Sequence, residues 1–475
     1  MENREKKLGR IYLDWSGKNL DKIEPLPAHG SYRSYFRIWQ DDRTVIGVHN
    51  EDRAENTAFL TFSRQFRSCG LPVPEIYFED LDNDVYLEED LGDETLFSFL
   101  SRTRDKHGFS NEIIAIYEKV IKLLPGFQIK AAKKIDYSVC YPRFSFDKQS
   151  MMWDLNYFKY YFLKLAKISF DEQKLEDDFQ SFTDYLLSAE RDYFLYRDFQ
   201  SRNIMLVDTE PFFIDYQGGR KGALQYDLAS LLYDAKADIP EEIRVHLLNL
   251  YIDTSAKMIK IEKSTFLKYF HGYVLIRIMQ ALGAYGFRGF YERKAHFLKS
   301  VPYAIQNLEN LLHQIQLPID IPELTDAWSK LVRSTALRQL GDVELRMTVR
   351  IQSFSYKRGI PWDEKGHGGG FVFDCRALPN PGRYPEYAEF SGNDQKVVDF
   401  FASQKEVSRF LNHVISIVDQ SIANYQRRNF TDLMVAFGCT GGQHRSVYCA
   451  NQLVDFIESK YKVKVEVRHR ELEMK

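Results

Sequence analysis

The stretch YRDFQSRN at residues 196–203, followed by FFIDYQGG at residues 212–219, decides how the first part of this sequence is interpreted. Asp198 and Asn203 lie in one short polar stretch, and Asp215 follows an apolar run typical of a strand. Transfer of a phosphoryl group from ATP needs a carboxylate at the acceptor hydroxyl and oxygen ligands for Mg²⁺. The alternative is an ordinary loop with a solvated Asp and a turn Asn. The joint occurrence of all three residues at this spacing favours phosphoryl transfer.

The sequence around this stretch changes from a strand pattern to a helix pattern. To about residue 105, runs such as SYFRIWQ (34–40), TVIGVHN (44–50) and VYLEEDLG (85–92) predict strands, with a helix over 55–69. From about 110 to 325, runs such as NEIIAIYEKVIKLL (111–124) have apolar residues at the three-to-four spacing of helices. We therefore predict an α+β, protein-kinase-like two-lobe fold, with an N-lobe over 1–105 and a helical C-lobe over 106–325.

Residues 10–325 resemble the aminoglycoside phosphotransferase family, on the loop above, LEEDLG (87–92) and QYDLASLLYD (225–234). Within that family they are most similar to bacterial sugar kinases that phosphorylate the anomeric hydroxyl of N-acetylmuramate or N-acetylglucosamine. The resemblance implies ATP and Mg²⁺ as cofactors, Asp198 as catalytic base, and Asn203 and Asp215 as metal ligands. It also implies that a hinge containing Glu88, Glu89 and Leu91 binds adenine. Asp227 would anchor the catalytic loop, or be a plain acid at a helix N-terminus.

The phosphate-binding part of this pattern departs from the family. The turn PAHGSYRSYF (27–36) contains only Gly30, so the small residues Ser31 and Ser34 must let the backbone approach the nucleotide. The second strand offers His49 and no lysine. Either Arg37 neutralises the phosphates, or Mg²⁺ does most of that work.

The rest of the chain predicts a connector over 326–343 and an α/β domain over 344–475. Predicted strands alternate with helices: FVFDCRAL, one long helix over 394–425, DLMVAFG, a helix over 447–459, and VKVEVRH. GCTGGQHRS (438–446) joins a strand to a helix, a typical place for an anion. Its candidate ligands are Thr440, Gly441, Gly442, Gln443, His444, Arg445 and Ser446.

The same loop fits Cys-x5-Arg-Ser, the spacing of cysteine phosphatases. That reading needs Cys439 as a thiolate and an acid, for which Asp374 is the obvious candidate. Asp374 is equally suited to hold a sugar hydroxyl. A purely structural turn is the third possibility.

Residues 344–475 also resemble the C-terminal domain of the RapZ family of RNase adapters. The matching stretches are SFSYKRGIP, FVFDCRALPNP, SGNDQKVVDFF, VAFGCTGGQHRSVY and VEVRHRELE. The resemblance implies binding of a sugar phosphate and of small RNA, and favours a binding loop in which Cys439 is a small buried residue. The basic residues of the last strand could contact RNA phosphates or form a solvated strand face.

Composition narrows the remaining choices. The chain has 475 residues, a net charge of -3 and scattered cysteines without metal-ligand spacing, which indicates a cytoplasmic protein and no dedicated nucleic-acid binder. No apolar run is long enough to span a membrane. We therefore predict an amino-sugar kinase with a sugar-phosphate-binding regulatory domain. The alternative is a non-catalytic, nucleotide-binding or RNA-binding adapter.

Overall fold

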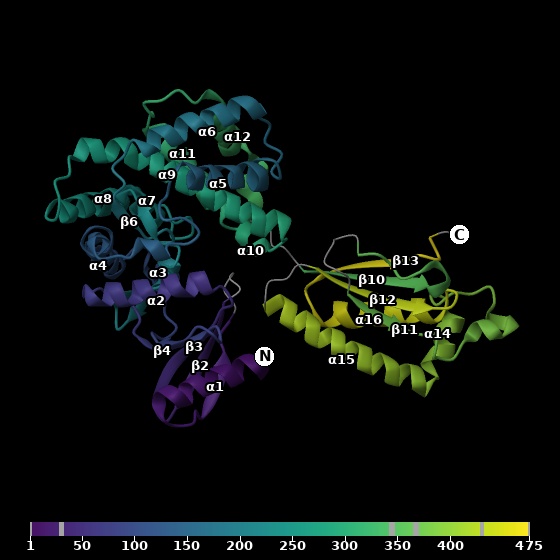
Figure 1. Cartoon of the computed structure of the whole chain (residues 1–475). Coiled ribbons are helices and arrows are strands. Elements are labelled where there is room, and N and C mark those ends of the chain that lie inside the picture. The colour runs from purple at the N-terminus through teal and green to yellow at the C-terminus, as the bar shows by residue number, and fades with distance from the viewer. Residues whose placement is uncertain (1, 28–32, 342–346, 364–369, 428–431, 474–475) are drawn as a thin grey trace. The chain divides into compact units, whose positions relative to one another are not determined.

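The structure is a computed structural model that describes residues 2–27, 33–341, 347–363, 370–427 and 432–473. Contacts between residues divide the chain into two compact units. The first comprises Met1–Phe287 and Ser300–Gln339, and the second comprises Arg288–Lys299 and Leu340–Lys475. Figure 1 shows the helices and strands of both units.

The small lobe of the first unit is an antiparallel sheet with strand order β1-β2-β3-β5-β4. Its strands are β1 Lys22–Pro25, β2 Ser34–Gln40, β3 Arg43–His49, β4 Ile76–Asp80 and β5 Val85–Glu89. Helix α1 (Glu2–Ser16) covers one face, where its Leu8, Ile11 and Tyr12 are buried against Phe36 and Leu87. The sequence analysis did not predict α1, β1 or β4.

The other face of this sheet is directed towards the large lobe, and we call it the inner face. Because side chains alternate along a strand, the paired residues Tyr35, Val48 and Tyr86 lie on it, and so do Arg37, Ile46 and Glu88.

Helix α2 (Arg53–Ser68) joins the two lobes. Its Phe59 stacks on Tyr216 at 5.0 Å, and its Ser63 hydroxyl lies 2.6 Å from the Tyr216 hydroxyl. Phe59 also contacts the ring of Tyr86 on the inner face. The small lobe is therefore tied to the segment that contains Asp215.

The large lobe is mainly helical, with two short two-stranded antiparallel sheets that carry the predicted catalytic loop. Its helices are α3 Leu96–His107, α4 Asn111–Pro125, α5 Lys148–Phe158, α6 Glu172–Leu187, α7 Leu224–Leu232, α8 Glu241–Ala256, α9 Lys263–Gly286, α11 Val301–Gln314, α12 Pro322–Arg333 and α13 Thr335–Arg338. One sheet pairs β6 Tyr193–Leu195 with β9 Arg220–Gly222, and the other is the hairpin of β7 Ile204–Val207 and β8 Glu210–Phe213. The expected connector begins in α12, whose Ala327, Trp328 and Leu331 are buried in this unit.

The second unit is a parallel sheet with strand order β11-β12-β10-β13. The strands are β10 Thr348–Ser355, β11 Phe371–Asp374, β12 Asp432–Cys439 and β13 Lys464–His469. Helices α14 (Gln395–Ala402), α15 (Lys405–Arg427) and α16 (Arg445–Lys460) pack on one face of the sheet around a shared apolar core (Figure 1). The short helix α10 (Ala295–Leu298) also belongs to this unit.

The predicted long helix over 394–425 is two helices, α14 and α15. The Ser403 N–H caps α14 by donating to the carbonyl of Asp399, and the Gln404 carbonyl accepts from Val407 and Ser408 at the start of α15. The apolar periodicity continues on both sides of this break, because both helices pack on the same core. Periodicity alone therefore could not reveal the break.

The α+β two-lobe unit followed by an α/β unit confirms the fold class predicted from the sequence. The predicted boundaries at residues 105, 325 and 343 stay predictions. Within the part of the chain that the structure describes, every helix is too short or too polar to cross a membrane.

Candidate active site

The catalytic loop is held in place by Asp227, near the start of α7. This fully buried carboxylate accepts hydrogen bonds from the backbone N–H groups of Tyr196 (2.8 Å) and Arg197 (3.0 Å), and from Gln128 Nε2 (2.8 Å). Burial raises the pKa of Asp227 to about 7, although the three donors act in the opposite direction. These bonds confirm Asp227 as an anchor of the loop.

The structure brings Asp198, Asn203 and Asp215 together. Asn203 Nδ2 donates both to the backbone carbonyl of Asp198 (2.8 Å) and to Asp215 Oδ2 (2.9 Å). Gln217 Nε2 donates to the other oxygen of Asp215 (2.6 Å). Asp215 and Arg197 both have a positive φ, of 69° and 84°. Such conformations are costly for residues other than glycine and concentrate at functional sites.

The charges of this cluster suit a divalent cation. Burial, and then the neighbouring carboxylate of Asp198, raise the pKa of Asp215 to about 6, and a cation would relieve both effects. Asn203 uses its amide nitrogen for hydrogen bonds, and among the described residues its amide oxygen has no partner. Mg²⁺ in kinases is held by one or two such side chains together with phosphate oxygens. Asn203 and Asp215 therefore fit the predicted Mg²⁺ site.

The same loop is also fastened to helix α5. The Arg197 guanidinium forms a bidentate ion pair with Asp154 at 2.6 and 2.8 Å, and also donates to the Tyr226 hydroxyl at 2.6 Å. It lies over the ring of Phe146 at 4.9 Å. Exposed aromatic side chains lie along the same segment, at Tyr141, Phe144 and Trp153. This segment approaches β9 through the bridge between residues 145 and 221.

The predicted nucleotide-binding residues do not all lie on the same face of the small-lobe sheet. Gly30 and Ser31 lie outside the described residues. The Ser34 hydroxyl accepts a hydrogen bond from Arg4 (3.0 Å) and therefore lies on the α1 side of the sheet. In the predicted hinge, Glu88 is buried on the inner face, and burial raises its pKa to about 8.

The rest of the hinge makes few contacts that would block a nucleotide. The Glu89 carboxylate lies 3.6 Å from the Arg67 guanidinium on the edge of the lobe. The backbone N–H of Glu89 donates to the backbone carbonyl of Glu75. Leu91 is buried, and its backbone groups have no partner within the described parts of the chain. The open backbone groups of Leu91 are therefore the part of the hinge that could meet adenine.

The structure departs from the expectation for Arg37. Its guanidinium is bonded to both oxygens of Asp90 (2.7 and 3.0 Å) and to both oxygens of Asp93 (2.9 and 3.1 Å). Arg37 pairs with Ile46 on β3, which pairs with Glu88 on β5. Asp90 and Asp93 follow β5 in the chain, so they contact Arg37 at the hinge end of the sheet. Arg37 is thus committed to neutralising hinge carboxylates rather than to phosphate.

The sequence analysis missed another arginine, Arg33. It immediately precedes β2, and its side chain is buried beside α2, where Nη2 lies 3.3 Å from Glu55 Oε2. An arginine next to a turn is usually solvated, so only the tertiary structure could distinguish it.

In the second unit, the loop 438–446 lies at the carboxyl ends of parallel strands, where ligands bind in open α/β sheets. Cys439 is buried, its sulfur accepts from the Gly442 N–H (3.1 Å), and Ser446 Oγ lies 3.2 Å away. This confirms Cys439 as a small buried residue. Gly442 has a φ of 67°, and a side chain there would lie 2.8 Å from the backbone nitrogen of Ser355.

Arg445 and Asp374 depart from their expected roles. Arg445 is buried, and its Nη1 donates to the backbone carbonyls of Arg376 (2.7 Å) and Leu378 (3.2 Å), so this part of the guanidinium supports the neighbouring loop. Nη2 contacts the Thr440 hydroxyl at 3.4 Å, and Nε has no acceptor among the described residues. Asp374 is paired with the Arg376 side chain at 2.6 Å, and that guanidinium lowers the pKa of Asp374.

What the loop offers an anion is therefore mainly backbone. Thr440 and Gly441 are exposed, and within the described ranges their N–H groups and that of Gln443 have no acceptor. His444 Nε2 faces the Tyr387 carbonyl at 3.3 Å, and Ser446 is buried against Cys439. Arg376, half exposed, is a nearby cation that the sequence analysis missed.

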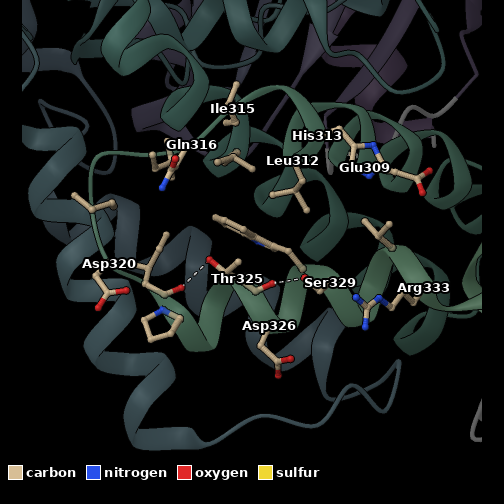
Figure 2. Close-up of a pocket in the computed structure, with 17 residues that line it drawn as sticks. Glu309, Leu312, His313, Ile315, Gln316, Asp320, Thr325, Asp326, Ser329 and Arg333 are labelled. Atoms are coloured by element: carbon tan, nitrogen blue, oxygen red, sulfur yellow. Dashed lines mark hydrogen bonds between the residues drawn. The ribbon is translucent and has the colours of Figure 1, made fainter.

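A cavity of about 710 Å³ lies between α11 and α12, away from these clusters. Figure 2 shows Leu312 and His313 on one side and Thr325 and Ser329 on the other. The hydroxyls of Thr325 and Ser329 donate to carbonyls of their own chain segment (both 2.9 Å), so they are already satisfied. None of the predicted phosphotransfer residues lines this cavity.

Comparison with known proteins matches each unit to a different family. The model of the phosphotransferase enzyme family matches residues 22–259, which is half of the chain. The model of the RapZ C-terminal domain matches residues 347–473. Both resemblances inferred from the sequence are therefore confirmed.

Similar proteins of known sequence match the C-terminal part. A nucleotide-binding protein of Idiomarina loihiensis is 35% identical over 181 residues, which are 38% of this chain and 61% of that protein. The RNase adapter protein RapZ of Yersinia pseudotuberculosis is 38% identical over 166 residues, which are 35% of this chain and 56% of that protein. The match thus spans less than two thirds of the length of these relatives.

Among solved structures, choline kinase LicA from Streptococcus pneumoniae aligns with a TM-score of 0.42 and 13% identity, over 66% of this chain and 99% of its own. Choline kinase from Cryptosporidium parvum aligns with a TM-score of 0.45 and 13% identity, over 68% of this chain and 98% of its own.

Proposed function

Because this chain belongs to the phosphotransferase enzyme family, we propose that its first unit is an ATP- and Mg²⁺-dependent kinase whose acceptor is a hydroxyl of an amino sugar. The observation that carries the proposal is the cluster of Asp198, Asn203 and Asp215, joined by the hydrogen bonds of Asn203. A non-catalytic adapter would have no use for a strained, partly desolvated carboxylate pair.

Each residue of the cluster has a distinct part in this proposal. The Asp198 carboxylate orients the acceptor hydroxyl and accepts its proton. Asn203 and Asp215 would hold Mg²⁺, which neutralises charge on the transferred phosphate. Asp227 and Asp154 act on the backbone and on Arg197, so they fix the loop on which Asp198 stands.

The amino-sugar acceptor is supported by the sequence resemblance to anomeric sugar kinases. The exposed rings of Tyr141, Phe144 and Trp153 give the acceptor side aromatic surfaces of the kind that line small-molecule sites. N-acetylmuramate and N-acetylglucosamine are the first candidates.

The test is a screen of acceptors with purified full-length protein, ATP and Mg²⁺, in which ADP formation and the phosphorylated product are measured. The panel contains N-acetylmuramate, N-acetylglucosamine, glucosamine, choline and an aminoglycoside. Turnover with an amino sugar, lost in Asp198→Asn, is expected. Turnover with choline alone would overturn the acceptor assignment, and ATP binding without any turnover would favour the adapter.

For the second unit, we propose binding of a sugar phosphate, or alternatively of small RNA, in a regulatory role. The support is the match to the RapZ C-terminal domain and the open backbone donors of the 438–446 loop. The buried sulfur of Cys439 accepts a hydrogen bond from the Gly442 N–H, a contact that a binding loop and a phosphatase loop would share. Calorimetric titration with glucosamine-6-phosphate, together with an assay for phosphate release, distinguishes binding from hydrolysis.

A further inference from the structure

We propose that Arg33 is the cation that contacts the ATP phosphates, with Glu55 as the residue that positions it. The proposal rests on the phosphotransferase function proposed above and names the contact that the sequence pattern left open. In protein kinases this contact is made by a lysine of the third strand, which pairs with a glutamate on the following helix.

The third strand of this chain cannot make that contact. Its residues on the inner face are Thr44, Ile46 and Val48, and none of them carries a positive charge. His49 lies on the α1 face, where burial first, and then Arg4 and Lys7, lower its pKa and keep it neutral. Arg37 is held by Asp90 and Asp93. Neither the described residues of β3 nor Arg37 can therefore supply a cation for the phosphates. Another element must supply it.

Arg33 provides one from the start of the neighbouring strand. Its side chain is 3% exposed, and Nη2 lies 3.3 Å from Glu55 Oε2 in the first turn of α2. Glu55 is itself oriented by Asn50 Nδ2, which donates to the same oxygen at 2.9 Å. Helix α2 follows β3, so Glu55 has the position of the kinase glutamate. Arg33 takes the part of the kinase lysine, but it precedes β2 instead of lying on β3.

The guanidinium is also incompletely bonded. Among the described residues, Arg33 Nε has no hydrogen-bond acceptor, and Nη1 makes only a long contact of 3.4 Å to the Tyr35 hydroxyl. A buried donor without an acceptor is costly, and a charged one more so. Arginine grips phosphate through several parallel N–H groups, so a phosphate would satisfy these donors.

The position of Arg33 relative to the metal-binding cluster agrees with this role. The Arg33 guanidinium lies over the ring of Phe59 at 5.6 Å, and Phe59 stacks on Tyr216, the neighbour of Asp215 in the chain. A phosphate held between Arg33 and the Mg²⁺ ligands would be contacted from both lobes. Without such an anion, Arg33 has Glu55 as its ion-pair partner.

The experiment measures calorimetric affinities of the full-length protein for MgATP and for adenosine. Arg33→Met should weaken MgATP binding by about 10- to 100-fold and leave adenosine affinity within about 2-fold, because the loss is confined to phosphate. Arg33→Lys should retain most of the MgATP affinity. The matched control is Arg64→Met, which removes an exposed arginine of the same lobe that pairs with Glu79, and it should leave both affinities unchanged.

A second variant guards against misfolding of Arg33→Met. Glu55→Gln, at a partly exposed side chain, should lower MgATP affinity several-fold, and should add little when combined with Arg33→Met. Equal losses for MgATP and adenosine, or unchanged MgATP binding in Arg33→Met or Glu55→Gln, would overturn the assignment. If the unmodified protein bound no MgATP, the proposed kinase function itself would be wrong. That outcome differs from the two results that would overturn only the role of Arg33.

Discussion

The catalytic loop of the first unit and the 438–446 loop of the second unit use their polar residues in opposite ways. In the first, Arg197 is tied to Asp154 and Asp227 to the backbone, and the loop holds Asp198 close enough to Asp215 to raise its pKa. In the second, Arg445 donates to two backbone carbonyls, and the sulfur of Cys439 accepts from an N–H of its own loop.

The difference teaches that residue spacing identifies a loop but does not say which of its side chains face a ligand. That is decided by the partners that the rest of the fold supplies. Two carboxylates close together indicate a cation site, whereas a guanidinium that donates to backbone carbonyls supports the local fold. The following changes test this contrast, beginning with the largest effect.

Asp215→Ala should abolish phosphoryl transfer, because phosphate charge is left uncompensated when a Mg²⁺ ligand is lost. It should also weaken MgATP binding far more than adenosine binding. Titration calorimetry and a turnover assay measure the two effects. Asp208→Ala, at an exposed position that also has a positive φ, is the matched control. Equal weakening of both ligands would mean that Asp215 supports the fold rather than the metal.

Asp198→Asn should lower kcat by at least about 100-fold with little change in nucleotide affinity, as expected for loss of a general base. Steady-state kinetics with the best acceptor from the screen gives kcat, and calorimetry gives the affinity for MgATP. A variant that turned over at a near-normal rate would remove Asp198 from the catalytic role.

Arg445→Ala should act on stability, because it leaves two buried carbonyls unpaired, at a cost of about 1 to 3 kcal/mol each. Arg376→Ala should instead weaken binding of glucosamine-6-phosphate by about 10-fold without loss of stability. Thermal unfolding and calorimetry separate the two, with the exposed Arg409→Ala as control. The contrast between the loops would break if Arg445→Ala lost the ligand while its melting temperature stayed unchanged.

Glu88→Gln should stabilise the protein at alkaline pH. Burial raises the pKa of Glu88 to about 8 in the folded state, so between its ordinary pKa and that value the folded chain retains a proton that the unfolded chain has released. Stability therefore falls as pH rises through this window. We expect a gain in melting temperature of about 2 to 4 °C at pH 8.5 that vanishes near pH 4. A gain independent of pH would contradict the assignment of the shift to Glu88.

The local part of the catalytic site was predictable from the sequence. Asp198, Asn203 and Asp215 occupy one loop and the end of a neighbouring strand, so their spacing in the chain reflects their spacing in the fold. The roles of Arg33, Arg37 and Arg445 were not predictable, because each is set by a partner distant in the chain. A long cationic side chain can reach many places, and sequence does not say which.

Among the helices and strands, too, those set by local sequence were predicted and those that depend on tertiary packing were missed. Strands β2, β3 and β5 and helix α4 follow from local periodicity. Helix α1 was missed because charged residues dominate its sequence, although Leu8, Ile11 and Tyr12 form a buried stripe. The break between α14 and α15 was missed because both helices keep their apolar faces on one core.

Strand β10 lies inside the sheet of the second unit, although it precedes its neighbours in the chain. Ser353 on β10 meets His469 on β13 across 116 residues. Pairings of this range close long loops and are slow to form. During synthesis, β10 is therefore exposed well before either neighbouring strand has been made. We expect this unit to fold late and to depend on chaperones, and a truncation that removes β13 to leave an open strand edge prone to aggregation.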